Sequence, residues 1–104
     1  MMLIEVLTFD GCPHEEAAMA LVVELAQEFG LRPDVQLIEV VDSPMATSLR
    51  FLGAPTIRVE GRDVEPSADD RRDYGLGCRL YRTSAGVSPT PDRDWLRSAF
   101  MQTG

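Results

Sequence analysis

Four side chains in this chain could carry chemistry: two cysteines, the single histidine and one glutamate. Three of them stand together, because Cys12 is followed by Pro13, His14 and Glu15. The second cysteine, Cys78, lies far along the chain. The thiolate is the form of cysteine that attacks disulfides and binds soft metal ions. The chemistry to expect is therefore thiol exchange or soft-metal binding centred on Cys12.

The position of Cys12 between two structural patterns makes it the stronger candidate. Residues 2–9 are largely apolar and read as a strand, and Pro13 suits the first position of a helix because proline has no N–H. A helix N-terminus offers free N–H groups and the positive end of the macrodipole, which favour a thiolate. Glu15 and Glu16 suit that dipole, but their charge opposes a thiolate nearby. We expect a partly exposed thiol at a helix start.

Length and charge limit the classes of function. A chain of 104 residues is a single domain, here residues 1–104. Its net charge of −7 argues against nucleic acid and against an anionic membrane surface as partners. No apolar run approaches the length that spans a bilayer, and the first residues already read as a strand, so we expect a cytoplasmic protein. In a reducing compartment two cysteines are more often reactive or metal-binding than structural, although each could be a small buried hydrophobic residue.

The pattern of apolar and polar residues predicts alternating strands and helices along most of the chain. Strands are predicted at 2–9, 35–41, 56–60 and 62–65, and helices at 13–29, 44–51 and from Thr90 onward. Residues 66–90, here called the insert, fit neither pattern well, although Cys78–Arg82 alternates and could form a fifth strand. The order strand–helix–strand–helix–strand–strand–insert–helix predicts an α/β domain with a mixed sheet of four or five strands flanked by helices.

Capping residues set the predicted starts of the later helices. Asp42 or Ser43 would cap the second helix, with Pro44 at its first position. In the same way Thr90 would cap the last helix, with Pro91 following it.

This order and two local motifs resemble the thioredoxin-like superfamily. Gly11-Cys12-Pro13-His14 puts a cysteine after the first strand, and Ala54-Pro55-Thr56 directly precedes the third strand. The resemblance implies a thioredoxin-like fold in which the Ala54–Pro55 bond is cis and Pro55 lies against the active cysteine. It also implies that the backbone beside Pro55 holds an extended partner chain. The resemblance covers about residues 2–65 and the last helix, and leaves the insert outside the family pattern.

The chain departs from the family at its redox motif. The family carries Cys-x-x-Cys, whereas Glu15 stands here where the second cysteine belongs. The Pro-His pair resembles that of strongly oxidising periplasmic members, which implies that His14 helps to stabilise the Cys12 thiolate. Without the local second thiol, a mixed disulfide needs an outside thiol, as in single-cysteine glutaredoxin-like proteins, or a resolving cysteine elsewhere. Cys78 is the one candidate in this chain.

The first hypothesis is therefore thiol–disulfide exchange, with a protein or a small molecule as the thiol or disulfide partner and no cofactor. Cys12 would attack, and Cys78 or a small thiol such as glutathione would resolve the mixed disulfide. Pro13, Glu15, Ala54, Pro55 and Thr56 would surround the reacting sulfur. The sequence names neither the substrate nor the oligomeric state.

Two alternatives belong to other classes. Cys12, Cys78 and Glu15 loosely resemble the constellation of organomercurial lyases, which implies two mercury ligands and an acid for the departing carbon, although those enzymes have Asp where this chain has Glu. A third hypothesis is a non-catalytic module whose cleft around Cys12 and Pro55 binds an extended segment by β-augmentation. A structural zinc ion is not expected, because two cysteines and one histidine do not complete four ligands.

Overall fold

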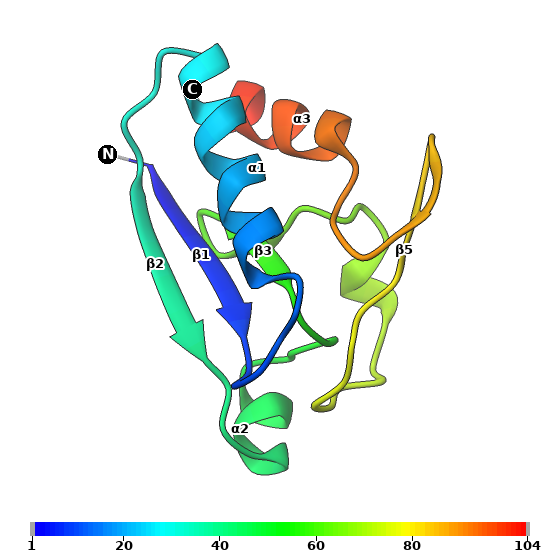
Figure 1. Ribbon diagram of the computed structural model, residues 1–104. Helices are drawn as coiled ribbons and strands as arrows, with labels where there is room; N and C mark the ends of the chain where they lie inside the picture. The colour runs from blue at the N-terminus through cyan, green and yellow to red at the C-terminus, as the bar shows by residue number, and fades with distance from the viewer. Residues whose placement is uncertain (1, 104) are drawn as a thin grey trace.

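The computed structural model describes residues 2–103 and contains a mixed four-stranded sheet with helices packed on it (Figure 1). The elements are β1 (Leu3–Thr8), α1 (Glu15–Glu28), β2 (Asp34–Glu39), α2 (Ser43–Ser48), β3 (Thr56–Val59), β4 (Arg62–Asp63), η1 (Ala68–Asp70), β5 (Tyr81–Thr83), β6 (Gly86–Ser88) and α3 (Arg93–Thr103). The predicted α/β class and the order of the elements are confirmed. Within residues 2–103, no helix has the length and apolar content needed to cross a membrane.

The strand order β2-β1-β3-β4 makes the sheet mixed, as predicted. β1 and β2 are parallel and joined by α1, whereas β3 runs antiparallel to β1 and forms a hairpin with β4. The predicted fifth strand does not join this sheet: β5 and β6 form a separate hairpin. In Figure 1 the insert, yellow-green to orange, runs along the side of the molecule opposite to β2.

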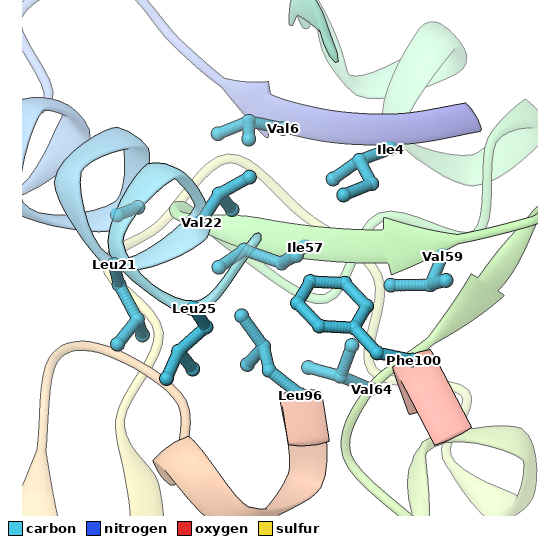
Figure 2. Close-up of a cluster of buried hydrophobic side chains, with 11 residues drawn as sticks. Ile4, Val6, Leu21, Val22, Leu25, Ile57, Val59, Val64, Leu96 and Phe100 are labelled. Carbon is cyan, nitrogen blue, oxygen red and sulfur yellow. The ribbon is translucent and has the colours of Figure 1, made fainter. Parts of the chain in front are cut away.

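The main hydrophobic core lies between one face of the sheet and the helices α1 and α3. Side chains alternate across a strand, so Ile4 and Val6 of β1 point to this face and Leu7 to the other. Figure 2 shows the α1 and α3 side chains gathered around Ile57. The buried members are Ile4, Val6, Ala18, Leu21, Val22, Leu25, Ile57, Val59, Val64, Leu96 and Phe100. Full burial of each large side chain contributes about 2 kcal/mol.

A smaller hydrophobic cluster lies at the carboxyl end of β1, close to Cys12. Its buried members are Leu7, Val40, Ala46, Phe51 and Ala54, and Cys12 is among the partly buried side chains packed against it. The short helix α2 supplies Ala46, and Arg58 of β3 holds the end of α2 by donating to the carbonyl oxygens of Leu49 and Arg50.

The two capping predictions have different outcomes. Asp42 caps α2 as predicted, because its Oδ1 accepts the Met45 N–H at 2.9 Å. The last helix, however, begins at Arg93, so the prediction of Thr90 as its cap is wrong. Asp92, which directly precedes α3, caps the helix instead of Thr90. Its Oδ1 accepts the Asp94 N–H at 2.9 Å.

Gly53 lies directly against Gly77 and Arg79 of the insert, and it supplies a test of this packing. Its φ is +117°, and a Cβ there would lie 2.9 Å from the Gly77 carbonyl oxygen and 3.2 Å from Cβ of Arg79. We therefore expect Gly53→Ala to lower the free energy of unfolding by about 2 kcal/mol.

Urea unfolding measures this effect, with Gly75→Ala as the matched control. A Cβ at Gly75 would meet nothing within 4 Å, so the control should change stability by less than about 0.5 kcal/mol. Equal urea midpoints for the two variants would contradict close packing of Gly77 and Arg79 against Gly53.

Candidate functional site

Cys12 lies in the loop that joins β1 to α1, where a tight turn positions it. Its N–H donates to the Phe9 carbonyl oxygen at 3.1 Å, and Gly11 adopts φ +83°, a conformation that favours glycine. α1 begins at Glu15 with His14 as its cap, so the prediction of a helix that starts at Pro13 is wrong by two residues. The turn at residues 9–12 precedes the helix, and the first helical hydrogen bond runs from the Ala18 N–H to the His14 carbonyl oxygen at 3.1 Å. The helix therefore starts later than predicted.

The Cys12 side chain is partly exposed, as predicted, and lines an open pocket of about 620 Å³. Four carboxylate side chains line the same pocket: Asp10, Glu15 and Glu16 from the loop and the first turn of α1, and Glu39 from the end of β2. No arginine or histidine is among the described residues that line it. Cys12 therefore faces an acidic cavity.

His14 does not join this lining, although it is only two residues from Cys12. Its side chain is partly exposed and makes no capping hydrogen bond to α1. Within residues 2–103, no hydrogen bond reaches the Cys12 sulfur either. The support of the thiolate by His14, which the resemblance implies, stays a prediction.

The Ala54-Pro55-Thr56 segment is buried, and the Ala54–Pro55 peptide bond is cis, as the resemblance implied. Ala54 belongs to the cluster against which Cys12 packs. Thr56 Oγ1 donates to the Gly53 carbonyl oxygen at 2.6 Å and so holds the bend before β3. The structure therefore places Cys12 and Ala54 at one hydrophobic cluster, although they are more than forty residues apart.

Cys78 is exposed, and its backbone lies beside Ala54. The two residues form a parallel bridge: the Ala54 N–H donates to the Gly77 carbonyl oxygen and the Arg79 N–H donates to the Ala54 carbonyl oxygen, each at 2.9 Å. Neighbouring strands lie about 4.8 Å apart, and the side chains of parallel partners point to the same side. The Cys78 backbone therefore borders Ala54, which belongs to the cluster against which Cys12 packs. The two thiols are free and line different pockets.

Both backbone hydrogen-bonding groups of Ala54 are thus used within the chain. An extended partner that added itself as a strand at this point would need them. In the third hypothesis, the non-catalytic module, a partner segment would bind to this backbone. The insert already forms these hydrogen bonds at Ala54.

Arg79, directly after Cys78, anchors the insert through a buried charge network that the sequence analysis missed. Its side chain is only 1% exposed, and its guanidinium donates to Asp63 at 2.7 Å, to Glu65 at 2.8 Å and to Thr56 Oγ1 at 2.9 Å. Both carboxylate side chains are nearly buried, at 10% and 11% exposure. The alternation of Cys78–Arg82 indicated only a possible strand and identified neither the burial of Arg79 nor its acceptors.

Tyr81 adds a second anchor from the same segment. Its hydroxyl donates to the Pro55 carbonyl oxygen at 2.5 Å, and its ring lies 4.4 Å from the guanidinium carbon of Arg79. Burial raises the pKa of the Tyr81 phenol above its ordinary value, and the nearby Arg79 charge offsets only part of this effect. Hydrogen bonds from residues 77–81 thus reach Ala54, Pro55 and Thr56 in turn.

The soft-metal alternative finds no ready centre in the structure. Among residues 2–103, no three His, Cys, Asp or Glu side chains gather closely enough to hold one metal ion. Cys12, Cys78 and Glu15 therefore do not form the three-residue centre that the lyase resemblance implied.

Comparisons with protein-family models, curated proteins and solved structures found no match to this chain.

The Arg79 network predicts a large loss of stability in Arg79→Gln. Removing one partner of a buried ion pair leaves uncompensated charge and costs about 3–5 kcal/mol. Here that charge is on Asp63, since Glu65 keeps its ion pair with Arg71. Arg97→Gln is the matched control, because Arg97 forms exposed pairs with Glu28 and Asp94 that contribute at most about 1 kcal/mol. Urea unfolding of both variants measures the difference. Similar losses would contradict the assignment of Arg79 as the anchor.

The buried phenol predicts a loss of stability at high pH. Because the pKa of Tyr81 is higher in the folded than in the unfolded chain, its contribution is complete below about pH 10 and is lost as the pH rises above that value. In Tyr74→Phe, Tyr81 is the one remaining tyrosine, so its ionisation can be followed by ultraviolet absorbance. We expect ionisation to coincide with alkaline unfolding, and a phenol that ionises near pH 10 in the folded chain would contradict this.

Proposed function

We propose that this chain is a thioredoxin-like protein that performs thiol–disulfide exchange, with Cys12 as the attacking thiol and Cys78 as the resolving thiol. The observation that carries the proposal is the position of Ala54. Cys12 packs against the cluster that contains Ala54, and Cys78 forms a backbone bridge with Ala54. The cluster that Cys12 packs against and the backbone that carries Cys78 therefore share Ala54.

The thioredoxin-like assignment has three further supports. The main sheet and its helices follow the order expected from the resemblance. Cys12 follows β1 and precedes α1, and the buried Ala54-Pro55-Thr56 segment leads into β3 beside it. Because one fold can carry many activities, the function depends on the thiols and their surroundings.

The proposed reaction balances without a cofactor. The Cys12 thiolate attacks one sulfur of a disulfide R–S–S–R. A disulfide bond forms between Cys12 Sγ and that sulfur, the S–S bond of the substrate breaks, and one R–S⁻ leaves. The Cys78 thiolate then attacks the Cys12 sulfur, which releases the second R–S⁻ and forms a Cys12–Cys78 disulfide. The two protein thiols supply two electrons, and their two protons go to the leaving thiolates. A thiol of the cytoplasm, the compartment that the sequence predicts, would return the protein to its reduced form.

The insert would set the geometry of the second step. Arg79 and Tyr81 follow Cys78 by one and three residues. Both donate hydrogen bonds to the Ala54-Pro55-Thr56 segment. Formation of the internal disulfide still requires the two sulfurs to meet, since bridged cysteines have Cα atoms less than about 7 Å apart. The exposed Cys78 side chain and the glycines before it allow this approach.

Single-turnover reaction of the reduced protein with bis-hydroxyethyl disulfide tests this mechanism. Wild type should release two thiols per chain and form an internal disulfide. Cys78→Ser should release one thiol and remain as a mixed disulfide at Cys12, which mass spectrometry identifies. Cys12→Ser should lower the rate of thiol release at least about tenfold, because Cys78 alone lacks the proposed site.

Thiol release at the wild-type rate by Cys12→Ser would end the proposal. A mixed disulfide that persists on wild-type Cys12 would exclude Cys78 as the resolving thiol. One tightly bound mercuric ion per chain, with both thiols protected and no exchange activity, would favour the soft-metal alternative instead.

A further inference from the structure

The charge of the Cys12 pocket sets a condition on what can react there. The sulfur shares an open pocket of about 620 Å³ with Asp10, Glu15, Glu16 and Glu39. A volume of this size accommodates a small molecule. None of the ten arginines of the chain is among the lining residues. A charged ligand in the pocket therefore meets four carboxylates and, among residues 2–103, no cationic side chain.

The N-terminus of α1 does not reverse this field. A helix N-terminus carries the equivalent of roughly half a positive charge, and its effect falls off within the first turn. Two of the four carboxylates, those of Glu15 and Glu16, belong to that first turn. The excess of negative charge therefore persists, and a concave site lined by one sign of charge raises the local concentration of ligands of the opposite sign.

The second condition on the substrate comes from the backbone of Ala54, beside Pro55. Main-chain hydrogen bonds give an added strand its affinity, and at Ala54 both groups are already bonded to Gly77 and Arg79. The buried Arg79 network and the Tyr81 hydroxyl hold this segment in place. An extended polypeptide would first have to displace the insert.

We infer that the Cys12 site reacts with small disulfides that are cationic or uncharged and discriminates against anionic ones. The inference rests on the proposed function and names its substrate class. It makes glutathione disulfide, whose carboxylates would face the four carboxylates of the pocket, a poor substrate. It also makes an extended disulfide-bonded polypeptide a poor substrate while the insert is seated.

The experiment compares three disulfides of similar size that differ in charge: cystamine, bis-hydroxyethyl disulfide and dithiodipropionate. The rate constant of each with Cys12 is divided by its rate constant with mercaptoethanol, which removes differences in intrinsic reactivity. At low salt we expect cystamine to react at least about tenfold faster than dithiodipropionate on this corrected scale. At about 1 M salt the ratio should fall toward one, because the Debye length shrinks to about 3 Å.

A pair of matched variants assigns the effect to the pocket. Glu39→Gln removes one lining charge at an exposed position and should lower the corrected ratio of cystamine to dithiodipropionate about twofold or more. Asp70→Asn removes one exposed charge that lies on η1, outside the pocket, and should leave the ratio unchanged.

The outcomes separate this inference from the proposed function. Reaction with all three disulfides at equal corrected rates, or faster reaction with dithiodipropionate, overturns the charge selection and leaves thiol exchange standing. Equal effects of Glu39→Gln and Asp70→Asn also overturn it, because the net charge of the chain would then explain the ratio. Absence of Cys12-dependent reaction with bis-hydroxyethyl disulfide, the uncharged probe, overturns the proposed function itself.

Discussion

The structure around Cys12 and Cys78 depends on one buried charge, the guanidinium of Arg79. Its side chain is almost fully removed from water, so the desolvation of its charge must be offset by partners within the protein. Asp63, Glu65 and Thr56 supply these partners from the strand β3 and the segment around β4. Because Arg79 belongs to the insert, the need to neutralise one charge fixes a segment that has little regular structure of its own.

This anchoring determines what the insert does at the site. With Arg79 and Tyr81 held, the backbone from Gly77 to Arg79 pairs with Ala54, a member of the cluster against which Cys12 packs. The same pairing uses the backbone groups that an incoming strand would require. The insert therefore has two consequences for the proposed chemistry: it places a second cysteine beside Ala54, and it occupies the backbone groups that a polypeptide could join.

This part of the structure contains two different electrostatic environments. The Arg79 network is a nearly buried cluster of oppositely charged side chains, and its contribution to stability depends on their pairing. The Cys12 pocket is open to water and carries carboxylates with no cation among the residues that line it. Charge pairing in the first environment contributes to stability, whereas unbalanced charge in the second acts on ligands, which is the basis for the substrate class proposed for Cys12.

The sequence by itself determined the local elements: the strand before Cys12, the periodic helix after it, and the Asp42 cap. These depend on preferences of residues close together in the chain, and they failed where a local hydrogen bond competed, as at Asp92. Only the tertiary structure decided that Cys78 lies beside Ala54, that Arg79 meets Asp63, and that Glu39 joins the pocket of Cys12. The physical reason is that such long-range contacts follow from which strands pair and which charges need neutralising, and local periodicity carries no information on either.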